Sequence, residues 1–359
     1  MTASAADSLV LPDQLADVLW FAEYDSDDSD TSAPVLVDLS APIASHDQLV
    51  SRTLRAARCS ARVLIGVATG AVPAANTSLA QELTLSLVAH AVQPDPEPAF
   101  VAVRDPLAVA GELTEVVRTR PIASASLAVL LQQTALLPVW EGLVAESATY
   151  STLLAGPEFA GWLAARPAMA APTETDDAVL VSRRGDELTL TLNRPERRNA
   201  YGRGVRDALV AALQVARIDE AVRVVLRGSG PAFCSGGDLA EFGTAPDPAR
   251  AHLVRLRHAA AQLMYDLADR TTAHLHGACI GAGIELPAFA WRVIAAPDTQ
   301  IALPEVGMGL VPGAGGTVSI VRRIGRWRTA WLALSGKPLS AGQAKAWGLV
   351  DVVGDDVRG

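Results

Sequence analysis

The sequence has little of what several classes of protein require. It contains three cysteines, Cys59, Cys234 and Cys279, an odd number without paired metal-ligand spacing. A disulfide framework and a zinc site therefore have no support, and a reducing cytoplasm is the expected compartment. Aromatic residues make up only 5% of the chain, whereas Ala, Val and Leu dominate, which favours helices packed tightly on a buried sheet.

Long apolar runs and basic clusters are also missing. No stretch approaches the ~18 consecutive apolar residues of a membrane span, and the N-terminus lacks the basic and apolar regions of a signal peptide. The net charge is −9 without a basic block, whereas binding to nucleic acid needs clustered Lys and Arg. We therefore expect no nucleic acid and no membrane among the partners, and a protein that acts on small molecules.

The first part of the chain shows an α/β alternation. Short apolar runs at 35–39, 63–68 and 100–103 predict buried strands, and segments of helical period, 47–57 and 79–91, lie between them. The sequence from 105 to 166 is helical throughout, broken by prolines and glycines.

A linker is predicted next. The stretch 165–178 is rich in Pro, Thr and Asp, and 359 residues suffice for about two domains, since single cores stop growing near ~250 to 300 residues. We place the boundary near residue 172, which gives domains 1–172 and 173–359.

The second part opens with two strand-like runs, 179–182 and 188–192, around a polar turn that is typical of a hairpin. A helix is expected at 203–215. A β-branched strand at 222–230 then leads into the glycine-rich loop FCSGGD at 233–238. Strand, helix and strand in this order predict a right-handed β-α-β crossover.

Three segments in this part, together with their spacing, resemble the crotonase (enoyl-CoA hydratase/isomerase) superfamily, and enoyl-CoA hydratases most closely. A single glycine cluster would be weak evidence, but here all the segments occur in the family's order between Val179 and Val353. They are NRPERRNA (193–200) with PAFCSGGDL (231–239), HGACIGAGIELPAFAWRVIAA (276–296) and ALPEVGMGLVPGAGGTVSIVRRIG (302–325). The resemblance implies an α/β fold with a crotonase-like spiral core of ββα repeats, and an acyl-CoA substrate with no metal and no cofactor beyond the coenzyme A of the substrate.

The resemblance also implies how a thioester is held. A developing enolate oxygen is best met by two fixed backbone N–H groups, and glycine-rich loops let the backbone approach closely. Carried over by motif, the donors are the N–H groups of Gly237 and Ala282. Family members often have Gly at the second position, but the donor is the backbone, so Ala282 adds only a methyl group. The same motifs imply substrate or CoA contacts at Arg197, Asn199, Ala200, Ser235, Asp238, Leu239 and Gly281.

Two glutamates stand in apolar surroundings, Glu285 in GIELPAFA and Glu305 in ALPEVGMG. Burying a carboxylate is costly unless the group is paired or functional. Burial also raises the pKa, which favours a protonated acid beside an ionised base. In hydratases of the family, two glutamates at these places activate the water that adds to the double bond. By this resemblance, Glu305 exchanges the proton at the α-carbon and Glu285 orients the water for the β-carbon.

Other interpretations remain open. Double-bond isomerisation needs only one acid/base group, and a catalytically weak scaffold subunit for another acyl-CoA enzyme would suit the unusual first part. A dinucleotide site is disfavoured, because the segment with Gly281 and Gly283 does not contain the third glycine of the GxGxxG dinucleotide-binding motif. The acidic residue that binds the ribose in that motif is also missing. Retention of both glutamates favours hydration.

Residues 1–172 lack equivalents of FCSGGD, GAGIE and PEVG, yet their alternation of predicted strands and helices resembles that of the second part. We interpret them as a degenerate crotonase-like α/β half. Their helical end resembles the helices that follow the GLVD segment in the family, and we expect it to take the place of that tail. The resemblance further predicts a homo-oligomer, either a trimer or a dimer of trimers, that takes part in fatty acid metabolism.

Overall fold

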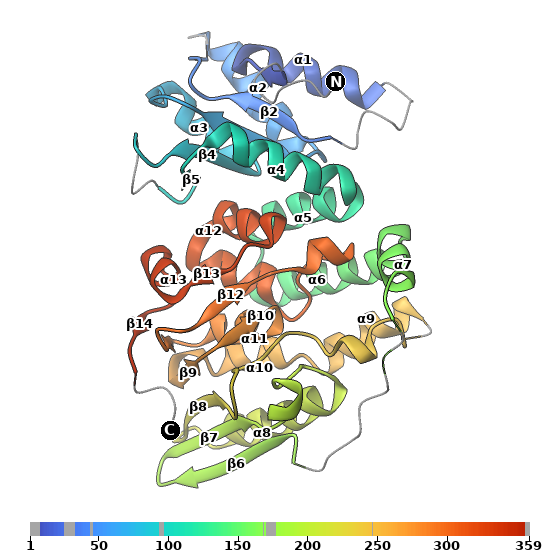
Figure 1. The fold of residues 1–359 in the computed structure, drawn as a ribbon, viewed down its shortest axis with the longest axis vertical. Helices are drawn as coiled ribbons and strands as arrows, with labels where there is room; N and C mark the ends of the chain where they lie inside the picture. The colour runs from blue at the N-terminus through green and yellow to red at the C-terminus, as the bar shows by residue number, and fades with distance from the viewer. Residues whose placement is uncertain are drawn as a thin grey trace. The chain divides into compact units, whose positions relative to one another are not determined.

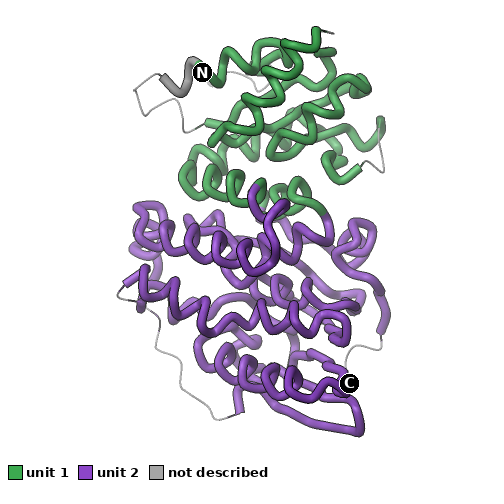
Figure 2. The backbone as a smooth tube through the Cα atoms, turned by 180° about the vertical axis from the view of Figure 1, so that it is seen from behind, with its two compact units in different colours: residues 1–132, 325–335 green, residues 133–324, 336–359 purple. Residues whose placement is uncertain are grey.

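A computed structural model gives the fold of the chain (Figure 1). It describes residues 8–24, 33–43, 46–92, 97–167, 169, 177–245 and 247–355. The chain forms two compact units, one of residues 1–132 with 325–335 and one of residues 133–324 with 336–359 (Figure 2). Within the described ranges, no helix has both the length and the apolar character needed to cross a bilayer.

The unit containing the N-terminus is built on a parallel sheet of five strands in the order β1-β2-β3-β4-β5. Strands buried on both faces read as continuous apolar runs, as Leu64–Ala68 does. The strands are β1 (Leu9–Val10), β2 (Val35–Asp38), β3 (Leu64–Ala68), β4 (Leu85–Ala89) and β5 (Phe100–Val103). The helices are α1 (Leu15–Tyr24), α2 (Asp47–Cys59), α3 (Thr77–Glu82), α4 (Pro106–Thr119) and α5 (Pro121–Thr134), the last of which runs on into the second unit.

One expectation for this unit is wrong. The segment 79–91 is not one helix, since α3 ends at Glu82 and β4 follows at Leu85. Leu85 and Leu87 are fully buried in the sheet, and Thr84 donates its N–H to the carbonyl of Leu64 at the start of β3. A short apolar run has no periodicity that separates a buried strand from a buried helix, so pairing with the neighbouring strand decides the outcome.

The second unit carries two sheets. The larger has the order β14-β11-β9-β8-β7-β6, and all its neighbours are parallel except the hairpin of β6 and β7. The smaller has the order β10-β12-β13. Their bounds are β6 (Val179–Arg184), β7 (Glu187–Leu192), β8 (Arg223–Gly228), β9 (Thr271–Leu275), β10 (Ala278–Ile280), β11 (Arg292–Ala295), β12 (Gln300–Ala302), β13 (Leu339–Ser340) and β14 (Val352–Val353). The hairpin and the β-α-β crossover expected from the sequence are confirmed.

Helices surround these sheets. They are α6 (Val139–Leu154), α7 (Pro157–Ala164), α8 (Arg203–Ile218), α9 (Pro248–Arg257), α10 (Ala260–Asp266), α11 (Ala282–Glu285), α12 (Gly316–Ser335) and α13 (Ala341–Trp347). The amphipathic helix α8 buries Leu209 and Leu213. Gly325 interrupts α12 with a φ of 78°, and there the chain passes from the second unit to the first.

The helical block before the predicted linker is divided between the units. Helices α6 and α7 belong to the second unit, where α6 packs on α9 and α10, whereas α4 lies in the first unit. Ser151 of α6 donates to the carbonyl of Pro248 at the start of α9 over 2.8 Å. Helices α6 and α7 thus pack within the second unit, and the replacement of the family's tail by the helical block stays a prediction. The expected boundary at residue 172 lies outside the described residues, and the domain limits 1–172 and 173–359 stay a prediction.

The packing of α6 can be tested at a glycine. A Cβ added to Gly142 would lie 3.0 Å from Cγ2 of Val318, which is fully buried, whereas one added to Gly161 of α7 would meet nothing within 4 Å. We expect Gly142→Leu to lower the free energy of unfolding by about 1–3 kcal/mol through overpacking. The matched Gly161→Leu should leave it unchanged or raise it by up to about 1 kcal/mol, because leucine is the better helix former. Urea unfolding of both variants checks this, and equal effects would contradict the packing of α6 on Val318.

Candidate active site

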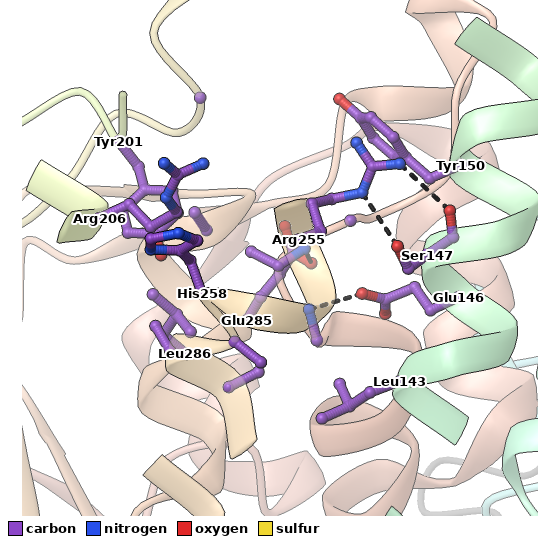
Figure 3. A pocket seen from close by; sticks show the side chains of 18 of the residues that line it. Leu143, Glu146, Ser147, Tyr150, Tyr201, Arg206, Arg255, His258, Glu285 and Leu286 are labelled. Carbon is purple, nitrogen blue, oxygen red and sulfur yellow. Dashed lines mark hydrogen bonds between the residues drawn. The ribbon is translucent and has the colours of Figure 1, made fainter. Parts of the chain in front are cut away.

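A cavity of about 220 Å³ lies within the second unit (Figure 3). It is lined from α6, the start of α8, the loop after β8, the helices α9 and α10, the turn into α11, and the loop before α12. Both Glu285 and Glu305 line this cavity, as do Gly237 and Ala282. The four residues assigned to chemistry from the sequence therefore border one space.

The turn between β10 and α11 requires a glycine. Gly281 has a φ of 49° and a ψ of −120°, and a Cβ there would run into Oε1 of Glu305. Ala282 follows as the first residue of α11, and its N–H donates to no acceptor among the described residues. The chain thus presents this N–H beside the cavity at the start of a helical turn.

The loop after β8 lies against the same turn. Cys234 donates its N–H to the carbonyl of Ala278 over 3.1 Å, and its own carbonyl accepts from Ile280 over 3.0 Å. Three residues further on, Gly237 faces the cavity, and its N–H also lacks an acceptor within the described part of the chain. A Cβ on Gly237 would lie 2.8 Å from the ring of Phe242. The N–H groups of Gly237 and Ala282, which have no acceptor among the described residues, therefore both border the cavity.

Glu285 is buried and held by the loop before α12. Its Oε2 accepts from the N–H groups of Ala314 over 2.8 Å and Gly316 over 2.9 Å. Burial raises the pKa of this carboxyl to about 7, although both hydrogen bonds favour the ionised form. Near neutral pH the group can therefore act as a base.

Glu305 begins the short 3₁₀ helix Glu305–Met308, and its environment differs from that of Glu285. Its Oε2 is buried without a hydrogen-bond partner among the described residues. Burial raises its pKa well above the ordinary value, and the charge of Glu285 raises it further. The carboxyl of Glu305 therefore keeps its proton to higher pH than an ordinary glutamate, and its Oε2 can bind a ligand or a water molecule.

A third buried carboxylate, which the motifs did not reveal, comes from α6. Glu146 accepts from the N–H of Gly315 over 2.7 Å and from the N–H and hydroxyl of Thr317 over 2.9 Å and 2.7 Å. Burial, and next the charge of Glu285, raise its pKa to about 8. A signal was present, because Leu143, Glu146 and Tyr150 lie three and four residues apart on one helical face that is otherwise apolar.

The residues expected to contact substrate or CoA do not line the cavity. Asn199 is fully buried, and its side chain bonds to the backbone of Arg194, Ser229 and Ala232. It holds the loop 194–200 against the strand end. The cavity is not lined by Arg197, Asn199, Ala200, Ser235, Asp238, Leu239 or Gly281.

Three of these residues join neighbouring loops. Arg197 and Asp238 form an ion pair at 2.7 Å, and Asp238 also accepts from the N–H of Ala240. Ser235 donates its N–H to the carbonyl of Arg198. These contacts hold the loop that carries Gly237 in place. That the predicted contact residues bind CoA outside the cavity stays a prediction.

The motif-bearing half of the chain has relatives among known proteins. The sequence profile described as enoyl-CoA hydratase/isomerase matches residues 187–357. A 2,3-dehydroadipyl-CoA hydratase of Escherichia coli is 35% identical over 176 residues, 49% of this chain and 68% of that protein. A 1,2-epoxyphenylacetyl-CoA isomerase of Escherichia coli is 35% identical over 175 residues, 47% of this chain and 66% of that protein.

The enoyl-CoA hydratase of Thermoplasma volcanium is 37% identical, with a TM-score of 0.47, over 50% of this chain and 72% of that chain. The relatives include hydratases and an isomerase at equal identity, so they agree on the family and differ in the reaction. The chain belongs to the enoyl-CoA hydratase/isomerase family, the crotonase superfamily to which its motifs pointed.

Proposed function

We propose that this protein adds water to, or removes it from, the α,β double bond of an enoyl-CoA thioester. One observation carries the proposal. Burial raises the pKa of Glu285 to about 7 and the pKa of Glu305 well above its ordinary value, and both carboxyls line one cavity that two N–H groups without acceptors also border. A base and an acid are thus available together with an oxyanion site.

The proposed reaction uses only side chains and backbone of this chain. The thioester oxygen accepts hydrogen bonds from the N–H groups of Gly237 and Ala282, which stabilise the enolate as charge moves onto that oxygen. Ionised Glu285 orients a water molecule and takes its proton as the oxygen bonds to the β-carbon. Protonated Glu305 delivers a proton to the α-carbon. No metal or redox cofactor enters the proposal.

Two other functions remain alternatives. A double-bond isomerase moves a proton between carbons and needs one acid/base group, whereas a scaffold subunit needs none. The presence of two carboxyls with different protonation states favours hydration over both. Assembly into a trimer or a dimer of trimers, and a cytoplasmic location, are parts of the proposal that rest on the family resemblance.

Replacing each glutamate tests the division of labour. Gln keeps the shape of Glu but cannot transfer a proton, a capacity worth roughly 10² to 10⁴ in rate. We expect Glu285→Gln and Glu305→Gln each to lower kcat for crotonyl-CoA hydration by at least 10²-fold, with the Kd of butyryl-CoA nearly unchanged. Loss of absorbance by crotonyl-CoA measures the rate, and calorimetry measures the affinity.

The exposed Glu220 provides the control, because Glu220→Gln removes the same charge far from any motif. The double variant should be little worse than the poorer single variant, since both groups act on one water. Damage by only one substitution would indicate isomerisation. Near-native hydration by both single variants would refute the hydratase proposal and favour the scaffold.

The pH profile tests the protonation states. Glu285 must be ionised, so kcat should fall as the pH drops below about 7, the pKa that burial gives its carboxyl. Glu305 must be protonated, so kcat should fall again at alkaline pH. The charge of Glu146 helps to raise the pKa of Glu305, and Glu146→Gln should therefore move the alkaline limb to lower pH. An alkaline limb that stays in place would show that Glu146 does not act on Glu305.

A further inference from the structure

Arg255, on α9, points into the cavity toward α6 (Figure 3). Its Nε donates to Oγ of Ser147 over 3.1 Å, and its Nη2 donates to the carbonyl of Ser147 over 3.2 Å and to Oγ of Ser151. The guanidinium lies 4.8 Å from the centroid of the Tyr150 ring. Neutral groups thus hold this cation in one position.

The guanidinium has no carboxylate partner among the described residues. Arg206 and His258, which are also labelled in Figure 3, both lie beside a carboxylate, since Arg206 donates to Asp207 over 2.8 Å and His258 lies 3.3 Å from the same carboxylate. Glu146 is near enough for its charge to raise the pKa of Arg255, but its oxygens accept from Gly315 and Thr317 instead.

Arg255 is half-buried, and burial lowers the pKa of its guanidinium. Its Nη1 makes no hydrogen bond within the described ranges and stays available. A guanidinium whose orientation is fixed and whose Nη1 is unused is suited to bind a carboxylate.

The cavity sets the length of the ligand. Its volume of about 220 Å³ is many times the ~10–15 Å³ that one water molecule needs, so it has room for an acyl chain. Glu285, Glu305 and Arg255 all line it, so a chain that starts at the glutamates and ends at Arg255 is short. A short acyl group with a terminal carboxylate fits both the size and the charge.

We propose that Arg255 binds the terminal carboxylate of the acyl chain, and that the substrates are CoA monothioesters of short 2-enedioic acids. This inference rests on the proposed function, because it takes the cavity to hold the acyl group of a CoA thioester. Arg255 is then the residue that selects acidic over neutral acyl chains.

Binding of unreactive thioesters tests the selection without any chemistry. We expect the full chain to bind adipyl-CoA at least tenfold more tightly than hexanoyl-CoA, which has the same number of acyl carbons, as measured by calorimetry. Arg255→Gln should abolish this preference while leaving the Kd of hexanoyl-CoA within about threefold. The exposed Arg257, at the end of the same helix, gives the matched control, and Arg257→Gln should keep the preference.

Three outcomes would overturn the inference. Equal Kd values for the two thioesters with the unsubstituted protein would show that no carboxylate site exists. Equal weakening of both thioesters and of free CoA by Arg255→Gln would place a CoA phosphate at Arg255. Equal weakening of both thioesters with a lowered Tm would make Arg255 a structural link between α6 and α9. If Arg255→Gln does not fold, Arg255→Lys, which keeps the cation, should retain part of the preference for adipyl-CoA. The ratio of the two Kd values in the unsubstituted protein tests the carboxylate site independently of either variant.

The hydration assay separates this inference from the proposed function. Hydration of 2-hexenoyl-CoA without any preference for the acidic thioester would refute the role of Arg255 alone. A tenfold binding preference without hydration of 2-hexenoyl-CoA or 2-hexenedioyl-CoA would refute the hydratase reaction and leave the acidic acyl site in place.

Discussion

Four consecutive backbone N–H groups at the start of α12 are divided between two buried carboxylates, and the arrangement of the cavity depends on this division. Residues 314 and 316 donate to Glu285, whereas residues 315 and 317 donate to Glu146. N–H groups at a helix N-terminus lack intrahelical partners, and each one buried without an acceptor would cost about 1–3 kcal/mol. The two carboxylates accept from all four of residues 314–317, and in return this segment fixes both carboxylates.

This division links distant parts of the sequence. Glu285 comes from the motif-bearing turn after β10, while Glu146 comes from α6, outside the segment that matches the family profile. The N–H groups favour ionised carboxylates, but burial outweighs them and leaves both pKa values near or above neutrality. A glycine is needed at 316, because a Cβ there would lie 2.6 Å from Cγ of Glu285. Local sequence and distant packing thus set the protonation of the candidate base together.

The motifs predicted the family and the gathering of Glu285, Glu305, Gly237 and Ala282 at one cavity. Hydrophobic periodicity and turn residues predicted the hairpin and crossover of the second unit. These features depend on local geometry, as Gly281 illustrates, because its backbone and the approach of Glu305 both require a residue without a side chain. Local sequence can encode such constraints.

The remaining features could not be read from the sequence because they depend on packing between distant segments. Arg255 and Glu146 acquire their roles only when α6 lies on α9, and the sequence separates them by more than a hundred residues. Likewise, the sequence predicted a helix where β4 pairs with β3 and β5 in the sheet. The motif predicted a ligand contact at Asn199, whose side-chain amide forms hydrogen bonds with three backbone groups.

In the proposed reaction, water adds across the double bond with its oxygen on the β-carbon. Incubating the full chain with crotonyl-CoA in ²H₂O enriched in ¹⁸O, followed by mass spectrometry and NMR of the product, tests this addition. Hydration should give 3-hydroxybutyryl-CoA with one ¹⁸O on the β-carbon and one deuterium on the α-carbon. A thioester that gains deuterium or shifts its double bond without taking up ¹⁸O would contradict it.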